Sequence, residues 1–224
     1  MDKKLKVLNI LGILSFVVTL IMGMTESSIV LMFMKNTAPL MMTFVGVHYA
    51  SLLIAVILYI LIVWEIGSIT HQRILGKFIF GLIWILLGIV FLAVDFGVAD
   101  GLSTSGSPGV FDYIIIFLLL GLGFFLIGIG VYMVCKTYYK IADISGSIYY
   151  KLSWRLIILG IVLFFIFLLT WMVVDKIPDN DRHYIGFLVL GYNLCYAIGQ
   201  LLFSIGAIKF EPDTRKKDNY FVTG

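Results

Sequence analysis

The sequence predicts an all-α polytopic membrane protein with six transmembrane helices arranged as three helical hairpins. Of its 224 residues, 61% are hydrophobic and only 13% are charged, and the mean hydropathy is +1.07. A water-soluble protein of this length needs more polar side chains to cover its surface. The apolar residues also lie in six continuous runs, and each run reaches the length of about 18 residues or more that is typical of a transmembrane helix.

The six runs cover residues 7–34, 40–64, 78–98, 111–135, 153–174 and 185–208. Helices are expected because lipid cannot satisfy open backbone groups, and the runs lack the alternation of transmembrane β-strands. About 20 helical residues, rising about 1.5 Å each, cross a hydrocarbon core of about 30 Å. The longest remaining segments, the loop 136–152 and the tail 209–224, are too short to bury a core. We therefore expect a single membrane domain, residues 1–224, surrounded by the lipid bilayer.

The first run follows a basic start, a combination that also occurs in signal peptides. No small-residue cleavage site follows this run, and five further apolar runs do. We therefore expect the first run to be retained as the first span.

Lysine and arginine are distributed unevenly between the two sides of the predicted domain. With the N-terminus inside, thirteen of them fall on the inner side and three, Lys35, Lys176 and Arg182, on the outer side. An excess of basic residues marks the cytoplasmic side of a membrane protein. We expect a cell-membrane protein whose termini, including the tail 209–224, are cytoplasmic. Because the inner basic residues account for the net charge of +3, no nucleic-acid partner is expected.

A short pattern recurs along the chain and predicts three equivalent hairpins. The odd-numbered spans share a core of leucine, glycine and isoleucine centred on Gly12, Gly88 and Gly160, and each predicted outer turn holds one proline, namely Pro39, Pro108 and Pro178. This spacing predicts an internal repeat of about 70 residues. The alternative is a chance match, because membrane helices are generally rich in these residues. The 22 glycines also predict close helix packing.

Four polar residues interrupt the apolar runs and form the candidate functional site. On the predicted topology Glu26, His48, Asp95 and Asn193 fall in the outer half of four different helices. Ionisable groups in a membrane are costly and are therefore functional candidates. A polar layer of this composition could carry protons or hold a small cation.

Each member of this layer also has a structural alternative. A helix over residues 7–34 is longer than the hydrocarbon core, so Glu26 could mark a break or the exit into the outer headgroups. Asp95 lies only a few residues from the outer turn, where it could contact water. His48 could serve as a hydrogen-bonding residue between two helices. These alternatives remain open from the sequence.

Motifs for metal binding, cofactor binding and catalysis are missing from the sequence. It contains no Cys-x-x-Cys and no His-x-x-x-His, and no histidine accompanies the serines of the stretch 104–107. Cys135 and Cys195 are predicted at different depths, so a disulfide is not expected. No second histidine matches the depth of His48, which argues against a bis-histidine haem. We expect no metal, no cofactor and no enzymatic activity.

The connection between the fourth and fifth spans carries a family resemblance. The residues at 138–146, Tyr-Tyr-Lys-Ile-Ala-Asp-Ile-Ser-Gly, precede a glycine-containing span that includes residues 156–162. This arrangement resembles a group of uncharacterised, mostly archaeal multi-pass membrane proteins with a Tyr-x-x-Ile-Ala-x-x-Thr-Gly-like loop. Ser145 stands where that group is expected to have threonine. The resemblance covers about the last ninety residues; it implies about six helices and no known activity.

Two functions are compatible with the sequence. The first is a non-enzymatic scaffold or accessory subunit that assembles with a membrane protein partner or as a homo-oligomer. The second is a small channel or transporter that uses the outer polar layer. The first is favoured because no span shows a central charge pair or a helix broken by glycine and proline, as transporters often do.

Overall fold

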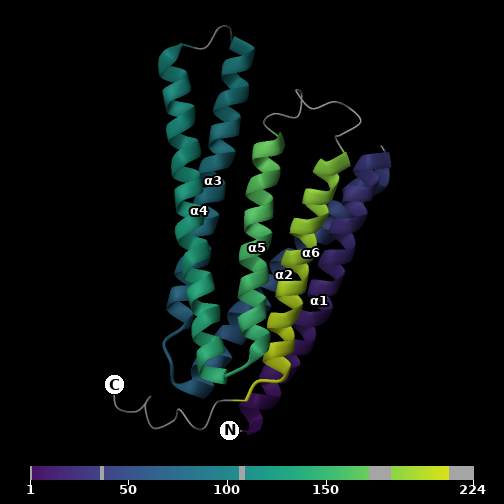
Figure 1. Ribbon diagram of the computed structural model, residues 1–224, viewed down its shortest axis with the longest axis vertical. Coiled ribbons are helices and arrows are strands. Elements are labelled where there is room, and N and C mark those ends of the chain that lie inside the picture. Colours follow the sequence, from purple (N-terminus) through teal and green to yellow (C-terminus); the bar gives the residue numbers. More distant parts are fainter. Residues whose placement is uncertain (1, 36–37, 106–108, 172–182, 212–224) are drawn as a thin grey trace. The chain divides into compact units, whose positions relative to one another are not determined.

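The computed structural model describes residues 2–35, 38–105, 109–171 and 183–211. Within these ranges the chain forms six helices, namely α1 (Asp2–Lys35), α2 (Ala38–Thr70), α3 (Leu75–Ser105), α4 (Val110–Ser145), α5 (Ile148–Trp171) and α6 (His183–Ile208) (Figure 1). Each contains a stretch long and apolar enough to cross a membrane. The predicted all-α class with six candidate spans is therefore confirmed.

Helix α4 is longer than the sequence predicts, and the prediction of a loop over residues 136–152 is wrong. The helix continues to Ser145, and only Gly146 and Ser147 separate it from α5. Tyr138, Ile141 and Ile144 are buried along this extension, and their spacing of three residues places them on one helical face. Burial of this face explains why the helix does not end with the apolar run at Cys135.

The chain divides into two compact units, and each is described by itself. Unit 1 contains residues 1–72 and 138–224, and unit 2 contains residues 73–137. In unit 1, α1 packs against α2 and α6, and α5 packs against α6. Unit 2 contains α3 and most of α4, which lie side by side as a hairpin (Figure 1).

The core of unit 1 is built around the last turns of α6. The Phe203 ring stacks on Tyr138 at 4.4 Å between centroids, and it meets the rings of Tyr59 at 5.4 Å and Tyr150 at 5.3 Å edge to face. Aromatic pairs favour these offset and perpendicular arrangements. The cluster joins α2, α5, α6 and the final turns of α4, which explains the burial of the α4 extension.

Glycine contacts close the α3–α4 hairpin of unit 2. A Cβ atom added to Gly81 would lie 2.9 Å from the Gly130 carbonyl oxygen, and one added to Gly88 would lie 2.6 Å from the Gly123 carbonyl oxygen. On each helix the two glycines are seven residues apart, which is about two turns. Helix backbones meet at this distance only where no side chain intervenes, so the predicted close packing is confirmed for this hairpin.

The equivalence of the three hairpins stays a prediction. Gly88 packs against the following helix, and Gly160 likewise lies 3.4 Å from α6 backbone atoms, measured from an added Cβ atom. Gly12 differs, because it packs against Ser204 and Ile208 of α6, although α2 is the next helix along the chain. The helix that Gly12 contacts is therefore determined by the packing of all the helices of unit 1, and not by the order of the helices along the chain.

Candidate functional site

The four residues of the predicted polar layer are divided between the two units. Glu26, His48 and Asn193 belong to helices of unit 1, and Asp95 belongs to α3 of unit 2. Convergence of all four side chains therefore stays a prediction. The environment of each residue nevertheless indicates what its side chain can do.

Glu26 belongs to α1, whose described residues include a candidate span over Lys3–Thr25. The helix is continuous from Asp2 to Lys35, so the alternative that the chain breaks at Glu26 is wrong. With 34 residues at about 1.5 Å each, α1 exceeds the thickness of the hydrocarbon core. The side chain of Glu26 is outside the described part of the structure.

His48 lies next to α1 through Thr25. Its Nδ1 is 3.4 Å from the Thr25 hydroxyl oxygen, which in turn donates a hydrogen bond to the Met22 carbonyl oxygen at 2.9 Å. A hydroxyl has a single hydrogen, so the Thr25 oxygen is left to accept from His48. This requires the Nδ1-protonated form of the ring. His48 thereby joins α1 and α2, which is the structural role weighed as its alternative.

Asn193 is buried on α6, and its Oδ1 has no hydrogen-bond partner among the described residues. The same holds for Oε1 of Gln200, which lies seven residues further along α6 and is also buried. Two turns of helix separate these residues, so they share one face of α6. Unpaired amide oxygens inside a membrane protein are costly, and this face can accept hydrogen bonds from a polar species.

Asp95 occupies an unusual position in the seam of the α3–α4 hairpin. It follows Gly88 by seven residues and therefore lies on the line of the two glycines that touch α4. The register that pairs Gly88 with Gly123 places Asp95 opposite Ile116, which offers no side-chain hydrogen bond. Asp95 is 3% exposed, and its Oδ1 has no partner in the described ranges. Asp95 thus occupies the position in the seam that Gly81 and Gly88 occupy at seven-residue intervals before it.

Buried hydroxyl pairs are the polar feature that the sequence did not reveal. Ser15 and Ser204 share a hydrogen bond of 2.9 Å between α1 and α6, and Thr19 and Tyr59 share one of 2.8 Å between α1 and α2. Ser204 also donates to the Gln200 carbonyl oxygen at 3.1 Å. A single hydroxyl hardly interrupts an apolar run. The only available signal was the four-residue spacing of Ser15 and Thr19, which places both on one face of α1.

The described residues include no group of three histidine, cysteine or acidic side chains that could hold a metal ion. Among the residues of unit 1 that the structure describes, the buried polar side chains are hydroxyls and amides, and His48 is half-buried. Such groups exchange hydrogen bonds and can accommodate a small polar species. Comparison with known proteins found no family model, no curated protein and no solved structure that matches the chain.

Proposed function

We propose that the chain is a non-enzymatic membrane scaffold or accessory subunit that binds a transmembrane helix of another protein or of a second copy. Its six apolar helices are compatible with an integral membrane protein. The basic residues at the inner ends of the predicted spans support a cell-membrane location with both termini in the cytoplasm. The proposal depends chiefly on one face of α4.

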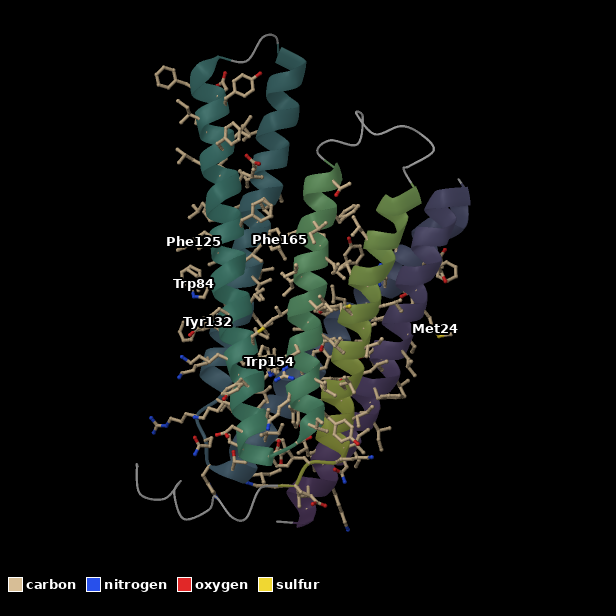
Figure 2. The ribbon with its side chains drawn as sticks, viewed as in Figure 1. Met24, Trp84, Phe125, Tyr132, Trp154 and Phe165 are labelled. Carbon is tan, nitrogen blue, oxygen red and sulfur yellow. The ribbon has the colours of Figure 1, made fainter. Side chains whose placement is uncertain are left out.

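This face carries large side chains at seven-residue intervals and is open in unit 2. Phe111, Leu118, Phe125 and Tyr132 are 82%, 67%, 64% and 62% exposed. Figure 2 shows Phe125 and Tyr132 projecting outward from α4. Large side chains repeated every seven residues form the seam by which one helix packs against another. We call these four residues the α4 stripe.

The opposite face of α4 explains why the stripe is free. Gly123 and Gly130 contact α3 on that side, so the four large side chains of the stripe point away from the seam of the hairpin. A partner helix would bury aromatic rings, which contribute strongly to interfaces. The proposal therefore assigns the stripe to a partner and the glycines to the hairpin itself.

Photo-crosslinking at single positions tests the proposal. A photoreactive phenylalanine analogue is placed at Leu118 or Phe125 in the stripe, or at Leu86, which is similarly exposed on α3 and serves as the control. The stripe positions are expected to give a protein adduct of one defined mass, whereas Leu86 gives lipid adducts. Coexpression of two tagged copies identifies a homo-oligomer. Lipid adducts at all three positions would contradict the proposal.

A small channel or transporter is the second candidate. It is supported by the side-chain oxygens of Asn193 and Gln200 on one face of α6, which have no partner among the described residues, together with the predicted polar layer of Glu26, His48, Asp95 and Asn193. Protons or a small cation would be the transported species. Ion flux in proteoliposomes separates this function from the scaffold.

A further inference from the structure

The turn between α4 and α5 brings two helix ends close together in unit 1. Gly146 has a φ of 63°, in the left-handed region that favours glycine. The Ser145 hydroxyl accepts a hydrogen bond from the Ser147 backbone N–H at 3.2 Å, and the Ser147 hydroxyl accepts one from the Tyr149 N–H at 3.3 Å. Ser147 therefore caps the N-terminus of α5. The result is a tight connection with the positive end of the α5 dipole beside the last turn of α4.

Basic side chains surround this connection. Lys151 and Arg155 are exposed and four residues apart on α5, and Lys140 is half-buried in the last turns of α4. Asp143 is the one acidic residue between 138 and 155, and it takes part in an interaction of its own. The net charge of this stretch is therefore positive, and the α5 N-terminus adds to the attraction for an anion.

Trp154 lies between Arg155 and Tyr139 in ring contacts that join α5 to the last turns of α4. The Arg155 guanidinium carbon is 5.9 Å from the centroid of the Trp154 ring, and the Tyr139 ring meets the indole edge to face at 6.2 Å. The indole Nε1 is buried and has no acceptor among the residues that the structure describes. A buried indole N–H normally finds an acceptor. The cluster thus offers several hydrogen-bond donors to an anion.

We propose that Tyr139, Lys140, Lys151, Trp154 and Arg155 form a binding site for the phosphate group of an anionic phospholipid, the α4–α5 headgroup site. Phosphate oxygens accept strong hydrogen bonds from guanidinium and ammonium groups. Basic and aromatic residues at the ends of transmembrane helices are the usual contacts of anionic headgroups. Arg155 is exposed, so its guanidinium can reach a phosphate group in the headgroup region.

The neighbouring surface of α5 favours a lipid over free phosphate. Ile158 and Leu159 lie one turn beyond Arg155 and are exposed, on the same face of the helix. Both lie in the candidate span Ile148–Phe167, whose first two turns carry Lys151 and Arg155. A phospholipid bound by its phosphate at Arg155 would lay its acyl chains along this surface. Inorganic phosphate would gain nothing from it.

Native mass spectrometry of the full-length protein tests the site. The protein is titrated with phosphatidylglycerol, with phosphatidylcholine as the neutral lipid and inorganic phosphate as the free anion. The double variant Lys151→Gln/Arg155→Gln is compared with Arg73→Gln, which removes an exposed basic residue outside the site. We expect the double variant to bind phosphatidylglycerol about 20-fold or more weakly, since each basic residue near a headgroup contributes about fivefold. Arg73→Gln should change this affinity less than twofold.

Trp154→Phe provides the second measurement, because it keeps an aromatic ring and removes the N–H donor. It should weaken phosphatidylglycerol binding several-fold and leave phosphatidylcholine binding unchanged. Equal losses in the double variant and Arg73→Gln would show a non-specific charge effect and overturn the site. If inorganic phosphate competed at the same concentrations as the lipid, the site would bind a free anion, and its assignment to a phospholipid would be wrong. Normal unfolding temperatures in phosphatidylcholine confirm that the variants are folded.

Discussion

At the residue scale, the buried hydroxyls act as links between helices. Ser15 pairs with Ser204, and Thr19 pairs with Tyr59. These hydroxyls thus form with one another the hydrogen bonds that lipid cannot provide. Interhelical hydrogen bonds of this kind contribute about 0.6 kcal/mol on average in membrane proteins. The sequence could not reveal these pairs, because their partners are 189 and 40 residues apart. Only the packing of α1 between α2 and α6 brings them together.

Tyr59→Phe tests this role. The change removes the hydroxyl that bonds Thr19 and leaves the Thr19 hydroxyl without this partner, so we expect the free energy of unfolding to fall by about 1 kcal/mol. Tyr49→Phe is the matched control, because Tyr49 is on the same helix and 65% exposed. Unfolding of the purified protein in mixed micelles with increasing SDS measures both. Equal stability of the two variants would refute the structural role of the pair.

Asp95 is the residue whose position conflicts most with its surroundings. It is buried, its Oδ1 is unpartnered among the described residues, and the hairpin register places it opposite Ile116. Asp95→Leu should therefore stabilise the protein by about 1 to 3 kcal/mol, since an unpaired buried carboxyl oxygen is costly. SDS unfolding checks this expectation. A loss of stability would mean that the carboxylate has a partner in the folded protein.

At the element scale, the sequence predicted which segments form spans but misjudged where the helices end. Hydropathy ends the fourth run at residue 135, whereas α4 reaches Ser145. The residues after the apolar run are therefore expected to form a loop, although Ile141 and Ile144 are buried by the core of unit 1. The glycine content predicted close packing correctly. It could not specify partners, as Gly12 shows by packing on α6.

Two glycines on α4 provide a matched test of the hairpin seam. A Cβ atom at Gly130 would lie 2.5 Å from the Gly81 carbonyl oxygen, whereas one at Gly128 would have no neighbour within 4 Å. Gly130→Ala should thus destabilise the protein by about 1 to 3 kcal/mol through overpacking. Gly128→Ala should leave it equally or more stable, because alanine favours the helix by about 1 kcal/mol. Similar SDS unfolding of both variants would contradict the seam.

At the scale of the whole molecule, the six-helix plan follows from composition and run lengths, but the division into two units does not. Unit 2 is a hairpin closed by its own glycines, and unit 1 combines α1, α2, α5 and α6 with the end of α4. Hydropathy treats all six spans alike. It therefore could not indicate that Asp95 belongs to a different unit from Glu26, His48 and Asn193, and the predicted polar layer stays a prediction.

The predicted orientation is tested by labelling single cysteines in intact cells, after Cys135 and Cys195 are replaced by alanine. A cysteine at Ser105, next to the turn between α3 and α4, should react with an impermeant thiol reagent. A cysteine at Thr223 in the tail should react only after the cells are opened. This pattern is expected because thirteen of the sixteen basic residues lie on the side of the membrane that carries the termini. The reverse labelling pattern would place both termini outside.

The measurement that tests the scaffold proposal most directly is ion flux through proteoliposomes containing the purified protein. A scaffold whose buried hydroxyls are paired between helices should conduct protons and monovalent cations no faster than liposomes without protein. Flux above that background that is abolished by Glu26→Gln or Asn193→Leu would contradict the scaffold. It would instead assign the polar residues of the outer layer to transport.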